Sequence, residues 1–115
     1  MSAAYFKLKR KEIFNNQVLL DLAYLLVDRC HVHVIHVGLF NHAENVSLNT
    51  KIDKVLDSEY TLDYLREKNP EINYIKLASA DSQGWIQINR NGKIATNQAK
   101  LFKQMKPVIK AYFKG

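Results

Sequence analysis

The chain has 115 residues, of which 47% are hydrophobic and 24% are charged, and these are the proportions of an ordinary globular domain. Its single cysteine excludes an intramolecular disulfide, and its apolar runs are far shorter than the roughly 20 residues of a membrane-spanning helix. We therefore expect one domain over residues 1–115, cytoplasmic and without a membrane crossing.

The net charge of +6 is unevenly distributed along the chain. Residues 1–11 carry +4, residues 12–70 carry −4, and residues 71–115 carry +6. Two basic ends that meet in the fold would form one patch able to bind a polyanion. The same asymmetry permits the basic ends of one copy to contact the acidic middle of another, so self-association is an alternative expectation.

The first forty residues predict a strand, a buried helix and a second strand. Tyr5 to Lys11 alternates between apolar and basic residues, which is typical of a half-buried edge strand. Asn15 or Asn16 is expected to cap a leucine-rich helix from about Gln17 to Asp28. The β-branched run from His31 to Phe40 is expected to be a central strand.

Two short helices are expected next, at Ser47 to Leu56 and at Thr61 to Lys68, with Thr61 capping the second and Asn69-Pro70 ending it. The pattern then returns to strands, at Ile72 to Ala78 and, after a polar turn, at Trp85 to Asn89.

The end of the chain predicts a hairpin followed by a helix. Asn91-Gly92 favours a two-residue turn into a returning strand at Lys93 to Ala95, and Thr96 is expected to cap the final helix. Together these elements predict an α+β fold. We expect a mostly antiparallel sheet of four to five strands with helices packed on one face.

The final helix is predicted to be strongly two-sided. Its apolar residues gather on one side of a 3.6-residue period, and five lysines gather on the other. The lysines are Lys100, Lys103, Lys106, Lys110 and Lys114. A row of this kind either keeps a helix surface solvated or presents positive charge to an anionic partner such as nucleic acid.

Further basic and aromatic residues extend the predicted nucleic-acid-binding set. Lys7, Lys9 and Lys11 lie on the first strand, and Arg90 and Lys93 flank the hairpin.

Trp85 belongs to the same predicted set. It shares a strand face with Gln87 and Asn89, opposite Ile86 and Ile88. If the isoleucines face the helix, the indole faces away and is available to stack on unpaired bases; the alternative is a tryptophan in the core.

The histidines provide the main candidates for catalysis or metal binding. His31 and His33 are expected to share a face of an extended strand, and His42 or Glu44 on the following loop is a candidate third metal ligand. The string from His31 to His36 resembles the histidine-triad nucleotide hydrolases, except that the third histidine is displaced by one residue and is expected on the opposite face. With the acidic residues between 53 and 67, these groups define an alternative function as a small histidine- or metal-dependent nuclease.

The opening of the chain carries a second resemblance. Tyr5 to Asn15, followed by the leucine-rich helix up to Arg29, is similar to the first segment of winged-helix replication initiators of plasmids and phages. This resemblance implies DNA association and an origin in a mobile element. After it, a histidine-rich strand stands where such proteins have their second and third helices.

The sequence therefore predicts a small basic protein, without a cofactor and not an enzyme, that binds nucleic acid or a nucleic-acid-handling complex. The mechanism would be neutralisation of the phosphate backbone, because lysines act as point charges. A regulator or inhibitor that docks an acidic protein surface is the principal alternative.

Overall fold

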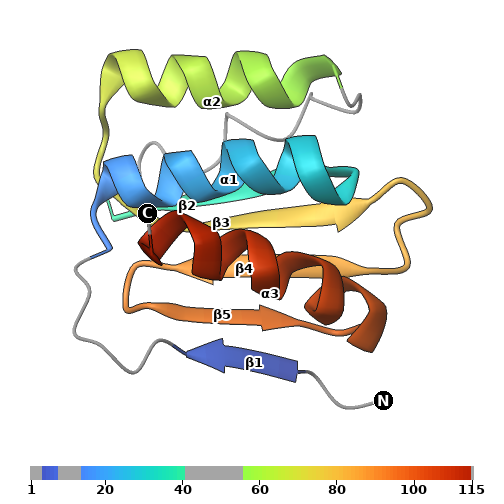
Figure 1. Cartoon of the computed structure of the whole chain (residues 1–115). Coiled ribbons are helices and arrows are strands. Elements are labelled where there is room, and N and C mark those ends of the chain that lie inside the picture. Colours follow the sequence, from blue (N-terminus) through green and yellow to red (C-terminus); the bar gives the residue numbers. More distant parts are fainter. Residues whose placement is uncertain (1–3, 8–13, 41–55, 115) are drawn as a thin grey trace.

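The computed structural model describes residues 4–7, 14–40 and 56–114, which form five strands and three helices (Figure 1). In chain order they are β1 (Ala4–Lys7), α1 (Asn16–Cys30), β2 (Val32–Leu39), α2 (Leu56–Lys68), β3 (Ile72–Ser79), β4 (Trp85–Asn89), β5 (Lys93–Thr96) and α3 (Ala99–Lys114). The strands form one sheet in the order β1-β5-β4-β3-β2, and every neighbouring pair is antiparallel. The predicted α+β class is confirmed.

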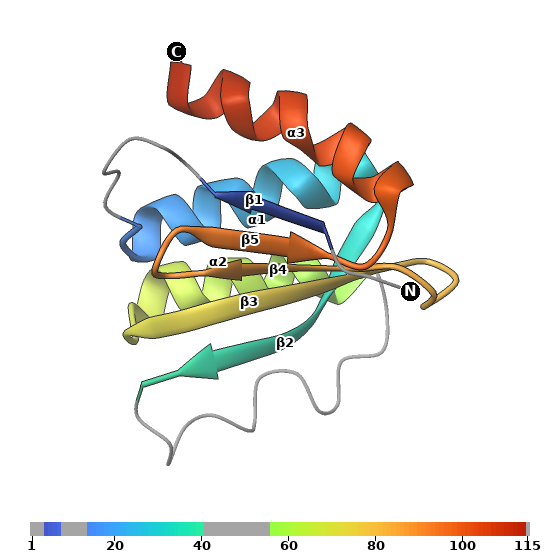
Figure 2. The ribbon, with the colours of Figure 1, turned by 90° about the horizontal axis from the view of Figure 1, so that it is seen from below.

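The helices lie on one side of the sheet, as predicted (Figure 2). α1 packs mainly on β3 and β2, α3 packs against α1 and the β1–β5 end, and α2 lies beside α1 at the β2 end (Figure 1). The core between these layers is aliphatic, with Leu22 and Leu26 of α1 facing Ile75, Ile86 and Ile88 of the sheet. No helix in the described segments is long and apolar enough to span a membrane.

α1 begins where the sequence predicts and ends two residues later. The Asn15 side chain accepts a hydrogen bond of 3.0 Å from the Val18 N–H, which satisfies an N–H that has no partner within the helix. The helix continues to Cys30, which is buried, and ends at His31 in the left-handed conformation with φ of 55°.

β2 is an edge strand, and the expectation of a central strand is wrong. Its only neighbour in the described sheet is β3. The outer edge is covered by α2, where the buried Ser58 hydroxyl accepts a hydrogen bond of 2.9 Å from the Val34 N–H. Because the Val34 N–H is bonded to Ser58, it is not available to pair with another strand, and β2 can keep buried, β-branched residues although it lies at the edge of the sheet.

The prediction that Thr61 caps the second of the two short helices is wrong. The helix already includes Leu56, and Thr61 is a buried residue in its interior. Its predicted end is confirmed, because the helix stops at Lys68 and Asn69 has a positive φ of 51°. The rest of the helix predicted from Ser47 lies outside the described residues.

Two turn details also differ from expectation. The β4–β5 connection has three residues, and only Gly92 has a positive φ, at 90°, whereas a two-residue turn needs two such residues. Thr96 is the buried last residue of β5 rather than a helix cap. Instead, the carbonyl of Gln98 accepts the first helical hydrogen bond of α3, from the Phe102 N–H at 3.0 Å.

Candidate nucleic-acid interface

The outer side of α3 carries the lysine row. Leu101, Met105 and Ile109 are buried on the opposite side of the helix. Four of the lysines are exposed, and Lys106 is half-buried, with its ammonium 5.7 Å from the centre of the Phe102 ring. None of the five forms an ion pair with a described residue. The helix therefore presents a row of positive charges without an ion pair to a described acid, and only at its start does Lys100 interact at longer range with Asp81, which lines the same hollow.

The first-strand lysines are only partly described. Lys7 is in register with Lys93 at the β1–β5 pairing, while Lys9 and Lys11 lie outside the described residues. Since α3 packs against β1, the strand that ends at Lys7 is adjacent to the helix that carries the lysine row.

The Arg90 side chain makes contacts within the protein. Its Nε donates to the Ile72 carbonyl at 2.6 Å, and its Nη2 donates to Asn16 Oδ1 at 2.5 Å. The guanidinium also lies 5.6 Å from the centre of the Phe40 ring. These contacts fasten the β4–β5 hairpin to β3 and to the start of α1, whereas Lys93 is exposed on the hairpin.

Trp85 lies on the face of the sheet opposite the helices. Ile86 and Ile88 are fully buried on the helix side, while Trp85, Gln87 and Asn89 alternate with them and are half-buried. The Lys76 ammonium lies 5.0 Å from the centre of the indole. Because α3 packs on the other side of the sheet, Trp85 and the lysine row do not form one continuous surface (Figure 2).

A β-bulge decides the orientation of the histidines. The register shifts between Val34 and His36, so that His33 pairs with Ala78 and His36 pairs with Lys76. The extra residue, Ile35, reverses the expected alternation and puts His36 on the same face as His33.

His31 does not share that face, and the expected His31–His33 pair is wrong. His31 lies at the left-handed end of α1 and lines a separate hollow with Cys30, Asp81 and Lys100. Within residues 4–7, 14–40 and 56–114 there is no group of three potential metal-binding side chains. The third candidate, His42, lies outside these ranges.

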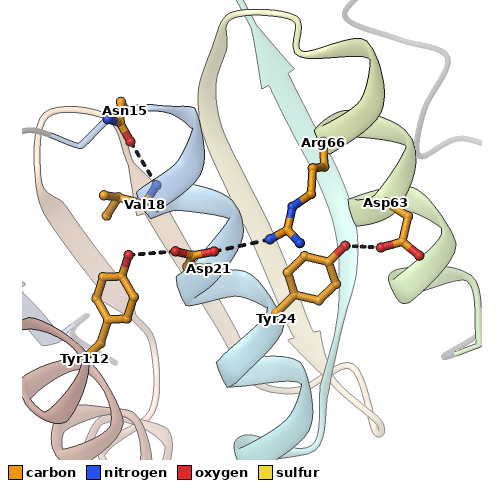
Figure 3. Close-up of polar contacts among 7 residues, drawn as sticks. All are labelled: Asn15, Val18, Asp21, Tyr24, Asp63, Arg66 and Tyr112. Carbon is orange, nitrogen blue, oxygen red and sulfur yellow. Dashed lines mark hydrogen bonds and ion pairs between the residues drawn. The ribbon is translucent and has the colours of Figure 1, made fainter. Parts of the chain in front are cut away.

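A hollow of about 540 Å³ lies among the three helices. Figure 3 shows its polar side chains bonded to one another: Arg66 and the Tyr112 hydroxyl both donate to Asp21, at 3.2 and 2.8 Å, and the Tyr24 hydroxyl donates to Asp63. The Arg66 guanidinium also lies 4.7 Å from the centre of the Tyr24 ring.

These contacts perturb both tyrosines in the same direction. Burial, then the hydrogen bond to Asp63, raises the pKa of Tyr24 to about 12. Burial and the hydrogen bond to Asp21 raise the pKa of Tyr112 to about 12. The polar groups of the hollow thus satisfy one another and tie α1 to α2 and α3, which is a structural role. In the sequence, Asp21 is visible only as a polar interruption of an apolar run.

Comparison with known proteins does not assign this chain to a family. The chain matches no protein-family model, and no similar curated protein or solved structure was found. The fold and surfaces define an α+β protein in which one antiparallel sheet carries a helix layer on one face, with a lysine row on the outside of that layer.

Proposed function

We propose that this protein binds nucleic acid through the lysine row of α3, with the ammonium groups contacting backbone phosphates. The observation that carries the proposal is the set of five lysines on one side of a helix, none paired with a described acid. At a rise of about 1.5 Å per residue, the row from Lys100 to Lys114 spans about 21 Å. A duplex carries roughly one phosphate charge per 1.7 Å of its axis, so each lysine has several phosphates within reach.

The chemistry of the row favours binding without sequence readout. An ammonium group is a compact point charge, whereas reading base edges relies on the planar donors of arginine or on amides. Binding of this kind is dominated by the release of counterions, so its affinity falls steeply with salt. The proposed role is binding, and it requires no reaction at the site.

The test is a charge reversal on the row. A triple variant with Lys103→Glu, Lys106→Glu and Lys110→Glu is expected to bind a labelled duplex of about 20 base pairs more than tenfold more weakly, measured by fluorescence anisotropy. Its thermal midpoint is expected to stay within a few degrees of wild type, because exposed charges contribute little to stability.

A control variant with Arg29→Glu and Lys68→Glu also reverses exposed cations, but on α1 and α2. It is expected to retain most of the affinity. Equal duplex affinity in the wild type and the triple variant would remove the lysine row from the functional account. No binding of duplex or single strand by the wild type, together with binding of an acidic protein surface, would favour the regulator.

A further inference from the structure

The sheet face opposite the helices carries a second cluster of side chains, referred to below as the open face. No described helix covers it (Figure 2). Its residues come from three adjacent strands and are His33, His36, Tyr74, Lys76, Trp85, Gln87 and Asn89.

Strand pairing arranges these side chains in rows. Trp85 pairs with Ala78, which pairs in turn with His33. In the next row, Gln87 pairs with Lys76, which pairs with His36. Neighbouring strands are about 4.8 Å apart, so each row presents its groups across a span of roughly 10 Å.

The aromatic groups on the β2 side are held in place. The Tyr74 hydroxyl lies 3.2 Å from His36 Nε2, and the two rings meet edge to face with centres 5.5 Å apart. The Tyr74 ring lies directly over Gly38, where a Cβ atom would be only 2.1 Å from Tyr74 Cε2. Glycine at this position therefore allows the tyrosine to lie down against the sheet.

The charged side chains described on the open face are all positive. Lys76 is its cation, the exposed Lys93 of the neighbouring strand β5 lies beside it, and the seven residues of the face include no acid. Burial, with a further contribution from the Lys76 ammonium, lowers the pKa of His36 and so disfavours a positive charge on this imidazole. The described residues of this face thus combine rings, amides and positive charge without a negative group.

We infer that the open face binds unpaired nucleobases, with Trp85 as the stacking residue and Lys76 as the contact to an adjacent phosphate. An indole offers a flat surface on which any base stacks. The Gln87 side chain donates to Asn89 Oδ1 at 3.0 Å, and Asn89 donates to the Lys93 carbonyl at 2.8 Å, so the Gln87 Oε1 is the amide atom that can accept a bond from a base edge exposed only in a single strand. When a base stacks on the indole, the Lys76 ammonium exchanges its contact with the ring for one with a phosphate. This inference rests on the proposed function for the class of ligand and adds a preference for unpaired strands.

The test uses the intrinsic fluorescence of the chain, because Trp85 is its one tryptophan. An oligothymidylate of about eight nucleotides is expected to quench the emission, whereas a duplex of equal length is expected to leave it unchanged. With a labelled oligonucleotide, Trp85→Ala is expected to weaken single-strand binding by about tenfold, and Trp85→Phe by less. Lys76→Gln is expected to reduce the salt slope of single-strand binding by about 0.7.

The matched control is Tyr60→Ala, because Tyr60 is 70% exposed and belongs to α2, which lies on the helix side of the sheet (Figure 2). It should leave single-strand affinity unchanged. Absence of quenching by the octanucleotide, or equal single-strand affinity in wild type, Trp85→Phe and Trp85→Ala, would overturn the inference. A blue shift of the emission with increasing protein concentration would overturn it as well, because a second copy would then occupy the face.

The two proposals fail in different measurements. If the lysine row is not a binding surface, the triple variant with Lys103→Glu, Lys106→Glu and Lys110→Glu keeps its duplex affinity. If the open face is not a base-binding site, the Trp85 substitutions have no effect while duplex binding still depends on the row. Quenching by the octanucleotide that persists in the triple variant would support two separate surfaces.

Discussion

The salt dependence of duplex affinity offers a quantitative test of the lysine row, because its slope reports the number of lysines that contact phosphates. Each lysine that neutralises a duplex phosphate contributes about −0.9 to the slope of log affinity against log salt. If all five lysines of α3 make such contacts, the slope is about −4.5, and raising salt from roughly 50 to 200 mM weakens binding by about 500-fold. A variant with Lys103→Gln and Lys110→Gln keeps three contacts, so its slope is about −2.7 and the same change in salt weakens binding by about 40-fold.

Both substituted lysines are exposed and unpaired among the described residues, so the fold should be unaffected. The matched control, Arg29→Gln with Lys68→Gln, removes the same charge from α1 and α2 and should keep the wild-type slope. Anisotropy titrations at four salt concentrations measure the duplex affinity of the wild type, the α3 variant and the control, and so give the slope for each protein. Parallel slopes in wild type and the α3 variant would refute the reasoning, even if the affinities differ, because net charge alone would then explain the difference.

Three further predictions concern the structure around these surfaces. Ser58→Ala removes the partner of the Val34 N–H at the buried β2 edge, and urea unfolding should show a loss of about 1–3 kcal/mol; an unchanged midpoint would mean that this edge is not sealed by Ser58. Gly38→Ala places a methyl group against the Tyr74 ring and should destabilise the fold by about 1–3 kcal/mol in the same assay, whereas equal stability would show that the ring moves freely. The raised pKa values of Tyr24 and Tyr112, about 12, mean that the folded protein keeps two phenolic protons that the unfolded chain loses near pH 10. Stability should therefore fall as pH rises from about 10 to 12, and less so in a variant with Tyr24→Phe and Tyr112→Phe; equal pH dependence in the two proteins would contradict the assignment.

The sequence by itself determines the elements whose signals are local. The 3.6-residue period of α3 separates Leu101 and Met105 from the lysines, and the two-residue period of β4 separates Ile86 and Ile88 from Trp85. Asn15 as the cap of α1 is likewise readable, because capping depends on residues within one turn. In each case, the residues that make the pattern are also the ones that make the contact.

Tertiary structure alone decides the neighbours of each strand and the register between them. The composition of β2 predicts a central strand, but α2 supplies the cover that a neighbouring strand would provide, through the bond from the Val34 N–H to Ser58. The bulge at Ile35 arises from pairing with β3, and it turns His36 onto the face of His33 against the alternation of the sequence. The β2 part of the open face, with His33 and His36 side by side, is therefore hidden from sequence reasoning. Side-chain direction in a strand depends on register, and register is fixed by hydrogen bonds between segments distant along the chain.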